Sequence, residues 1–460
     1  MNIGAPDHVN GQAGPELSSL SDSSMVNISL YWVGAALLSA LYASAAVEAL
    51  TPDPANGRWV DTWASMPQLT ETSNLPPSPF IQFRNTTVRQ TIRVSTGAKQ
   101  IRIRLSNAFG TINLPITSAT IAFPLNGTAG ASAIQTSSLQ TLTFSGNTSV
   151  VIPNGALAVT DPIAFAVQPE TMVTVTVYLE QGQQSSDITS HPGSRTTSWL
   201  VNGNHVGAAD LRDLSGLTSV EHWYFLSAVE AWSPKAVKAL VIIGDSITDG
   251  RGSTTNGNDR WPDQLLTRTQ SNPTTKNIIT IINQAAGGNR ILADGLGPNV
   301  FGRIERDVLS HSGVAYAMIF EGVNDIGTAS PTTINTVPDL LIQAFRQISV
   351  RVHALGIPFF GATITPFFGN TYYTPQNEAA RKRVNEWIRS HSGSGGVFDA
   401  LIDFDAAVRD NSVGGNVERI NPTFDSGDGL HLNPAGYKAM AETFDLTLFD
   451  KFASGVIGFQ

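Results

Sequence analysis

The chain has no cysteine among its 460 residues. This absence excludes disulfide bonds and metal sites built from thiolates. It leaves secretion open, because a chain of this length can bury enough apolar surface without cross-links. The length also exceeds what a single hydrophobic core usually serves, so two folded domains are expected.

Charge is sparse, and positive charge is in deficit. Charged residues make up 14% of the chain, and the formal net charge is -9. A nucleic-acid partner normally requires a basic face, which this composition argues against. The acidic balance also disfavours adsorption to anionic membranes. With 41% hydrophobic residues, the composition is that of a globular protein.

The N-terminal region contains an apolar run at residues 28–46, after a polar extension at residues 1–24. The run ends near Ala43-Ser44-Ala45 and predicts a signal peptide at residues 25–45, although no Lys or Arg precedes it. A retained anchor is the alternative, but the run is only marginally long enough to cross a bilayer. We therefore expect a secreted, extracellular protein without stable membrane insertion. Translation from Met25 is the alternative start.

Three Asn-x-Ser/Thr sequons follow the apolar run, at Asn85, Asn126 and Asn147. Each is a hypothesis of surface glycosylation, and together they fit a eukaryotic secretory route.

Residues 46–235 predict an all-β domain. Alternation of apolar and polar residues is clear in 101–105 and in 173–177, which indicates strands with one solvent-facing side. No long helical period interrupts this half, so a jelly-roll-like β-sandwich is expected. The expected strands are 86–94, 100–105, 119–123, 140–144, 149–152 and 171–179.

Residues 236–460 change to apolar strands that alternate with helical patterns. The expected strands are 239–243, 278–283, 316–321, 358–364 and 400–404. The expected helices are 261–269, 302–310, 337–355, 377–390 and 434–451. Strand, helix, strand in repetition predicts an α/β domain with a doubly wound parallel sheet and helices on both faces.

The most informative motif is Gly244-Asp245-Ser246, which closes the apolar run 237–243. A buried strand that ends in this way delivers a small hydroxyl to the carboxyl edge of an α/β sheet, where such folds bind ligands. A serine alone is unreactive, so Ser246 requires a base and an oxyanion pocket from elsewhere in the chain.

A base and its orienting acid stand near the C-terminus, at Asp428 and His431. Asn433 and Pro434 are a good helix start, so the pair lies in the loop before a helix. A separation of three residues allows the carboxylate to hold Nδ1 of the imidazole and leaves Nε2 to take a proton. The alternative is that Asp428 only caps a turn.

Two further blocks supply oxyanion donors. Asn324 follows the apolar run 316–320 and can present a neutral amide, or it can simply tolerate a left-handed turn. Gly287 and Gly288 follow another strand, and their backbone N–H groups can approach a substrate closely because no side chain intervenes.

In this order the four blocks resemble the SGNH family of GDSL-type serine esterases. The resemblance implies a flavodoxin-like hydrolase domain at residues 236–460, with Ser246 as nucleophile, His431 as general base and Asp428 as its orienting acid. It also implies an oxyanion hole formed by the N–H groups of Ser246 and Gly288 and by the side-chain amide of Asn324. Family members need no cofactor and no metal.

The resemblance extends to a subgroup in which a β-rich domain precedes the hydrolase. Its marks are 59–64, 102–110, 244–250 and 260–262, and the subgroup is similar to bacterial and fungal esterases linked to xylan deacetylation. Ala285 departs from the pattern, which has glycine there, but it precedes the proposed donor.

The expected function is that of a secreted serine esterase, a carboxylic ester hydrolase that acts on short-acyl, above all acetyl, esters of plant cell-wall polysaccharide or oligosaccharide. Asp245, Trp261, Asn289 and Arg290 stand beside the motifs and are expected to contact the substrate. A lipase or phospholipase acting on longer acyl chains is the alternative within the family. A catalytically silent glycan-binding protein is the alternative of another class, and the β domain could bind glycan, shape the active-site mouth or only stabilise the hydrolase.

Overall fold

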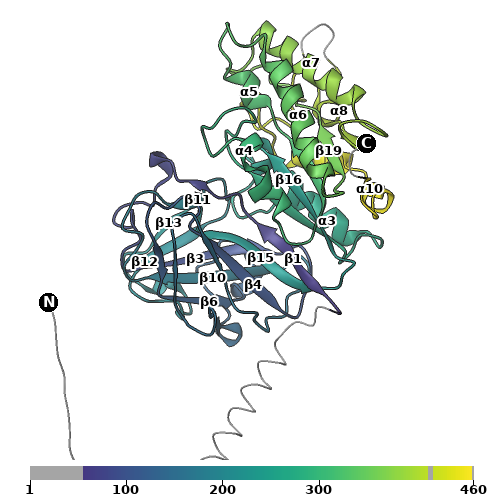
Figure 1. The fold of residues 1–460 in the computed structure, drawn as a ribbon. Helices are drawn as coiled ribbons and strands as arrows, with labels where there is room; N and C mark the ends of the chain where they lie inside the picture. Colours follow the sequence, from purple (N-terminus) through teal and green to yellow (C-terminus); the bar gives the residue numbers. More distant parts are fainter. Residues whose placement is uncertain (1–54, 413–417, 458–460) are drawn as a thin grey trace, which may run out of the picture. The chain divides into compact units, whose positions relative to one another are not determined.

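A computed structural model describes residues 55–412 and 418–457 of the chain (Figure 1). The expected extension at residues 1–24 and the expected signal peptide at residues 25–45 lie outside the described residues. Antiparallel sheets occupy the first part, up to Ser233, and a parallel sheet begins at Lys238.

The antiparallel part is built on two main sheets. Their strands are β1 (Arg58–Ala64), β3 (Thr86–Arg93), β4 (Ile101–Ser106), β6 (Ser118–Ala122), β7 (Gln140–Thr141), β9 (Leu157–Val159), β10 (Met172–Leu179), β12 (Ser198–Asn202), β13 (Thr218–Val220) and β15 (Leu226–Ser233). One sheet has the order β1-β15-β4-β9, and the other has the order β13-β12-β3-β10-β6-β7. Shorter strands form two small sheets: β14-β11-β2 and β5-β8, with bounds β2 (Gln68–Leu69), β5 (Leu114–Ile116), β8 (Val150–Ile152), β11 (Thr189–His191) and β14 (Trp223–Tyr224).

The two main sheets share one hydrophobic core. Ile103 and Val229 enter it from one sheet, and Ile121 and Val175 enter it from the other, all without solvent exposure. Burial of one face of each sheet against the other is the arrangement of a β-sandwich. The all-β part expected from the sequence is thus present as an antiparallel β-rich domain.

Strand β10 differs from the expectation of one wet face, because every residue in it is buried. Arg89 explains this burial: its guanidinium donates to the Thr176 hydroxyl at 3.0 Å and to the carbonyl oxygens of Ser132 and Ala208 at 2.6 and 2.8 Å. Loops therefore cover the polar face of β10 through a fully buried cation. Burial lowers the pKa of Arg89 to about 10 despite the nearby Asp210 carboxylate.

The second part is a parallel, doubly wound sheet, as the sequence predicts. Its strands are β16 (Lys238–Gly244), β17 (Ile279–Ala285), β18 (Val314–Phe320), β19 (Phe359–Ala362) and β20 (Ala400–Ile402). The order β17-β16-β18-β19-β20 is the 2-1-3-4-5 arrangement of flavodoxin-like folds.

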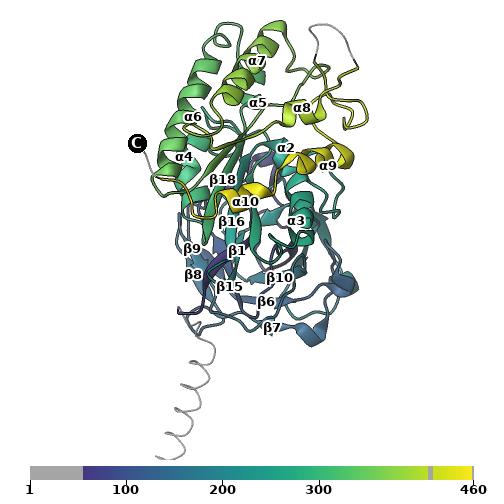
Figure 2. The same cartoon turned by 90° about the vertical axis from the view of Figure 1, so that its right-hand side faces the viewer.

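Helices cover both faces of this sheet. They are α2 (Ser246–Asp249), α3 (Trp261–Ser271), α4 (Val300–Ile304), α5 (Val323–Gly327), α6 (Val337–His353), α7 (Pro375–Ser390), α8 (Phe404–Val408), α9 (Pro434–Thr443) and α10 (Thr447–Lys451). Figure 2 shows α3 and α9 on one side of the sheet and α4 and α6 on the other.

Two expected helices are interrupted. The helix expected at 302–310 is a short α4 followed by a π-helical turn, Glu305–Leu309. The helix expected at 434–451 ends at Thr443, because Phe444 is extended and Asp445 accepts a hydrogen bond from the Thr447 N–H at 2.9 Å, which starts α10. Arg268 stabilises the break by donating to the carbonyl oxygens of Ala441 and Phe444.

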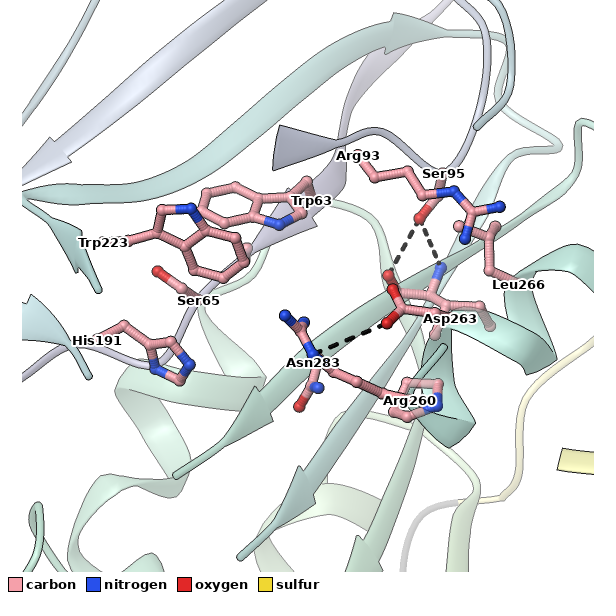
Figure 3. Close-up of a pocket in the computed structure, with 13 residues that line it drawn as sticks. Trp63, Ser65, Arg93, Ser95, His191, Trp223, Arg260, Asp263, Leu266 and Asn283 are labelled. Atoms are coloured by element: carbon pink, nitrogen blue, oxygen red, sulfur yellow. Dashed lines mark hydrogen bonds and ion pairs between the residues drawn. The ribbon is translucent and has the colours of Figure 1, made fainter. Parts of the chain in front are cut away.

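Hydrogen bonds join the β-rich part to the parallel sheet. The Ser95 hydroxyl bonds both the N–H and the carbonyl oxygen of Ile281, at 3.2 and 3.1 Å, on the outer strand β17. Asp61 accepts from the His311 imidazole at 2.6 Å and from the Ser312 N–H at 2.9 Å. Ser95 and Ile281 also line a small polar cavity, with Trp223 and His191 on its β-rich side and Asn283 on the other (Figure 3).

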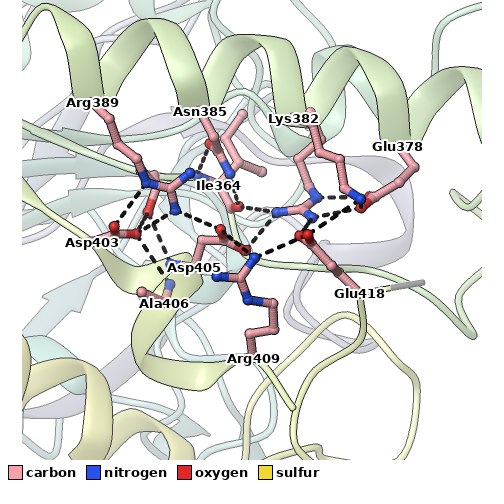
Figure 4. A network of polar contacts seen from close by, with 12 residues as sticks. Ile364, Glu378, Lys382, Asn385, Arg389, Asp403, Asp405, Ala406, Arg409 and Glu418 are labelled. Carbon is pink, nitrogen blue, oxygen red and sulfur yellow. Dashed lines mark hydrogen bonds and ion pairs between the residues drawn. The ribbon is translucent and has the colours of Figure 1, made fainter. Parts of the chain in front are cut away.

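A buried ion network fixes α7 to the loops that follow β19 and β20 (Figure 4). The fully buried guanidinium of Arg381 bonds Glu378, Asp405 and Glu418 at 2.7, 2.7 and 2.6 Å, and it also donates to the Ile364 carbonyl oxygen at 3.0 Å. These carboxylates outweigh the opposing effect of burial and raise the pKa of Arg381 above its ordinary value. The network therefore holds a permanent positive charge in the interior.

We expect Arg381→Met to lower the free energy of unfolding by about 3–5 kcal/mol, because it removes the fully buried cation of the network. The carboxylates then keep the more exposed partners Lys382, Arg389 and Arg409. The matched control is Arg383→Met on the same helix, whose ion pair with Asp339 is solvent-exposed and should contribute less than about 1 kcal/mol. Urea unfolding of both variants measures the difference. Equal losses of stability would contradict the assignment of the network.

Candidate active site

Three loops that carry the predicted site residues meet at one edge of the parallel sheet. Ser246 follows β16, Gly288 follows β17, and Asn324 follows β18. Because β16 pairs in parallel with both neighbours, all three strands end at the same edge. The strand order reverses at β16, because the chain runs from β16 to β17 on one side and then crosses to β18 on the other. Open α/β sheets bind ligands at such a position.

The turn after β16 presents Ser246. Gly244 permits the turn, since a Cβ at that position would lie 2.3 Å from the Thr248 hydroxyl oxygen. The Asp245 carboxylate accepts from the Ile247 N–H at 2.9 Å and caps the short helix α2, of which Ser246 is the first residue. The serine side chain therefore stands on a fixed backbone and keeps 8% of its surface exposed.

Ser246, His431 and Asp428 form a continuous hydrogen-bonded chain. The Ser246 Oγ lies 2.7 Å from Nε2 of His431, and Nδ1 of the same ring lies 2.6 Å from Oδ2 of Asp428. The second oxygen of Asp428 accepts from the backbone N–H groups of His431 and Leu430 at 2.8 and 3.0 Å. The carboxylate thus fixes the ring so that Nε2 is available to accept the serine proton.

The electrostatic environment favours a neutral imidazole beside an ionised carboxylate. Burial lowers the pKa of His431 below its ordinary value of 6.5, although Asp428 partly opposes the shift. For Asp428, burial acts to raise the pKa, but hydrogen bonds from His431 and Leu430 outweigh it, and the pKa lies below its ordinary value. The base is therefore ready to accept a proton at neutral pH.

Hydrogen-bond donors surround the serine. Among the described residues, none accepts a hydrogen bond from the backbone N–H of Ser246 or of Gly288. Gly288 has a φ of +72°, a left-handed conformation that favours glycine, and Leu296 packs against it. Asn324 donates one amide hydrogen to the Asn289 carbonyl oxygen at 2.9 Å and accepts from the Tyr372 hydroxyl at 3.0 Å. Its second amide hydrogen is left for a ligand.

A comparison with known protein families covers the same residues. Residues 240–444 match the family model of the GDSL-like lipases and acylhydrolases, a range that contains every residue named above for the serine, its base and the donors. Residues 240–444 are therefore a GDSL-like acylhydrolase domain. Comparison with curated proteins finds no match.

Solved structures similar to the acylhydrolase domain are distant. A protein assigned to the lipolytic G-D-S-L family from Desulfitobacterium hafniense DCB-2 is 22% identical, with a TM-score of 0.34 over 45% of this chain and 97% of that one. The acetylxylan esterase Axe2 from Geobacillus stearothermophilus is 19% identical, with a TM-score of 0.34 over 49% and 97%. A GDSL-like lipase from Bacteroides thetaiotaomicron VPI-5482 is 18% identical, with a TM-score of 0.32 over 45% and 85%.

Two residues expected to contact the substrate lie inside the acylhydrolase domain instead. Trp261 is fully buried, donates to the Thr248 hydroxyl at 3.2 Å and packs edge-on against Phe404, so its ring has no free face for a sugar. Asp245 is 1% exposed and is occupied by the helix cap described above. Burial, with added repulsion from Asp325 and Asp249, raises the pKa of Asp245 to about 7.

The other two residues expected to contact the substrate, Asn289 and Arg290, also have partners within the protein. The Asn289 side chain is buried, donates to the carbonyl oxygens of Leu296 and Pro298 at 3.2 and 2.9 Å, and accepts from Arg303. It therefore shapes the glycine loop and does not face a ligand. Arg290 is half-buried, and its guanidinium donates to the Asp294 carbonyl oxygen.

Sequence reasoning did not identify the loop between β19 and α7. Tyr372 orients the Asn324 amide, and Asn370 donates to the Asp428 carbonyl oxygen at 2.9 Å. Phe368 in the same loop is 37% exposed beside them. The adjacent Tyr372 and Tyr373, in the connection that follows β19, were the available signal, because ligand sites beyond the carboxyl edge of such a sheet are lined largely by apolar and aromatic side chains.

The three sequon asparagines Asn85, Asn126 and Asn147 are all exposed, so occupancy remains a prediction that the fold permits. Within residues 55–412 and 418–457, no cluster of His, Asp and Glu has the composition of a metal site. Nor is any helix in that part of the chain sufficiently long and apolar to cross a membrane.

We expect Asn324→Ala to lower kcat by ~10²-fold to 10³-fold, as for other lost oxyanion donors. KM should change little, because the amide contributes mainly to the transition state. Steady-state kinetics on a nitrophenyl ester measure both constants. An unchanged kcat would exclude Asn324 from the oxyanion site.

Activity should fall on acidification as His431 takes up a proton. Because the pKa of His431 lies below its ordinary value of 6.5, the neutral base persists below that pH, and the midpoint of the acid limb of kcat/KM should lie below pH 6.5. The pH dependence of labelling by an organophosphonate should follow the same limb. A midpoint above pH 6.5 would contradict the assignment of this base.

Proposed function

We propose that the protein is a secreted serine esterase that removes short acyl groups, acetyl above all, from plant cell-wall polysaccharide. The observation that carries the proposal is the chain of contacts from Ser246 to His431 and Asp428, at 2.7 and 2.6 Å. A hydroxyl, a base and an orienting acid in this order are what acyl transfer through an acyl-enzyme requires.

In the proposed mechanism, the Ser246 Oγ attacks the ester carbonyl carbon while its proton passes to Nε2 of His431. The N–H groups of Ser246 and Gly288 and the Asn324 amide hold the oxyanion that forms. The carbon–oxygen bond to the alcohol then breaks, and the alcohol leaves with the proton from Nε2. Water repeats the sequence: it gives its proton to Nε2, attacks the acyl carbon, and the carboxylic acid leaves as Ser246 regains a proton.

A short acyl group is supported by the side chains that flank the donors. Leu296 packs against Gly288 on one side of the site. Tyr372 donates to the Asn324 amide oxygen and packs against Gly327, where a Cβ would lie 2.1 Å from its Cδ2. Bulky side chains beside both donors leave limited room around the carbonyl, which suits an acetyl group.

A polysaccharide alcohol is supported by aromatic side chains in the loop between β19 and α7. Phe368 is exposed, and Tyr372 and Tyr373 are half-buried, so that ring faces and hydroxyl groups are present together at the site. Sugars combine apolar C–H faces with hydroxyl groups and pack on such surfaces. Secretion is supported by the apolar run that ends at Ala43-Ser44-Ala45.

Esters of longer acyl chains are the second candidate substrates. Leu296 beside Gly288 is 48% exposed, and Phe368 near Asp428 is 37% exposed. Exposed apolar side chains next to an oxyanion donor and next to the orienting acid are a surface on which an acyl chain can lie.

Two measurements test the proposal together. Ser246→Ala should abolish hydrolysis of nitrophenyl acetate, because no other group supplies the nucleophile. A series of nitrophenyl esters from acetate to palmitate should show the highest kcat/KM at acetate, and acetate should be released from acetylated xylan. Full activity of Ser246→Ala would reject the serine mechanism, and a maximum at long chains would favour the lipase alternative.

A further inference from the structure

A histidine of the β-rich part reaches the turn that carries Ser246. His191, the last residue of β11, places its Nε2 2.9 Å from Oδ1 of Asp249. Both side chains are almost fully buried, with 5% and 2% exposure. Asp249 is the last residue of α2, the single helical turn that Ser246 begins.

The same carboxylate holds the glycine loop. The second oxygen of Asp249 accepts from the Gly287 N–H at 3.0 Å, one residue before the proposed donor Gly288. Two adjacent glycines have more rotational freedom than any other pair of residues, so the direction of the Gly288 N–H depends on what anchors the loop. Asp249 therefore connects the nucleophile turn to the oxyanion donor, and His191 fixes Asp249.

We propose that His191 is a positioning residue of the acylhydrolase domain, supplied by the β-rich part, which through Asp249 points the Gly288 N–H at the oxyanion that forms beside Ser246. The inference rests on the proposed function, since it assigns Gly288 as an oxyanion donor. It gives the β-rich part a specific role in the reaction, beyond support of the fold.

The surroundings of His191 are arranged to hold its ring in one place. Its Nδ1 lies 3.1 Å from the Met66 carbonyl oxygen, so both ring nitrogens lie within hydrogen-bond distance of an oxygen atom. The ring stacks on Trp223 at 5.7 Å, and Trp223 is itself fixed by donation to the Thr91 carbonyl oxygen at 3.0 Å. Figure 3 shows the two rings together on the β-rich side of the cavity.

The backbone after β11 also approaches Asp249 closely. A Cβ at Gly193 would lie 1.7 Å from Oδ2 of Asp249, so no larger residue fits without displacing the carboxylate. The β-rich part therefore approaches the same Asp249 oxygen, Oδ2, that accepts the hydrogen bond from the Gly287 N–H.

A second histidine–aspartate pair joins the same two parts and provides the control. His311 and Asp61 are 2.6 Å apart and buried, but His311 precedes β18, at the edge of the sheet opposite to Ser246. If cross-contacts of this kind only stabilise the fold, loss of either pair should have the same effect on the reaction.

The test compares His191→Asn, His191→Gln and His311→Gln in the full chain. The Gln amide nitrogen takes nearly the position of Nε2 and can still donate to Asp249, whereas the shorter Asn cannot reach it. The measurements are kcat and KM on nitrophenyl acetate per titrated active site, the melting temperature, and the affinity for phenylboronic acid, which forms a tetrahedral adduct with a reactive serine.

For His191→Asn we expect kcat to fall about 10-fold to 100-fold, the effect of a donor displaced by roughly 1 Å. KM should change little, and boronate affinity should fall with kcat, because both depend on the oxyanion donors. His191→Gln should recover part of the loss, and His311→Gln should lower only the melting temperature. Gly193→Ala displaces Asp249 while His191 remains, and it should cause the same loss of kcat. This variant replaces His191→Asn in the test if His191→Asn does not fold.

The inference is overturned if kcat per titrated site is unchanged in His191→Asn or, where that variant does not fold, in Gly193→Ala. Equal losses of kcat in His191→Asn and His311→Gln would also overturn it. These outcomes differ from a failure of the proposed function, in which Ser246→Ala would keep its activity and the wild-type protein would have no titratable serine.

Discussion

Parallel pairing of β16 with β17 on one side and β18 on the other is the constraint on which the site depends. The pairing brings the ends of three strands, separated by up to about eighty residues of chain, to one edge of a sheet. Each strand then needs only a few residues to deliver Ser246, Gly288 or Asn324 to a common point. The base arrives from the C-terminal loop, where Asp428 and His431 are neighbours in sequence and need no long-range assembly beyond the docking of that loop.

The predicted site residues that the structure brings together are those encoded locally in the sequence. Gly244 to Ser246, Gly288 and the Asp428–His431 pair are short patterns at the ends of apolar runs, and the order of strands and helices predicts which ends meet. Trp261 shows the limit of this reasoning: an aromatic residue near a catalytic turn has the same sequence signature whether it faces solvent or, as here, packs against Phe404. Thr174 and Thr176 show the same limit in the β-rich part, since alternation cannot reveal that Arg89 and two loops cover the polar face.

His191 could not be predicted from sequence for a different reason. It lies 58 residues before Asp249, in a short strand without a clear apolar pattern, and its partner is a carboxylate that the sequence presents as part of a polar turn. Pairing between such residues follows from the docking of one sheet on another, which depends on the tertiary packing of both. The break between α9 and α10 has a similar origin, because Arg268 from α3 binds the carbonyl oxygens that the helix leaves open.

Although only 14% of the residues are charged, several charged side chains lie in the interior of the protein. Arg89, Arg381 and Asp61 are all fully buried. Each of them joins segments distant in sequence through several hydrogen bonds. Such networks contribute little net stability compared with apolar packing, but loss of one member is costly, so they restrict the chain to one arrangement.

The contact of Ser95 with Ile281 has a consequence for solubility. Strand β17 is the outermost strand of the parallel sheet, and its free side would otherwise present unpaired N–H and carbonyl groups to other molecules. The Ser95 hydroxyl occupies both groups of Ile281 and imitates a neighbouring strand at the centre of that side. The β-rich part thus covers an edge strand that could otherwise pair with strands of other molecules. A hydrolase domain without it would expose this edge and would be prone to aggregation.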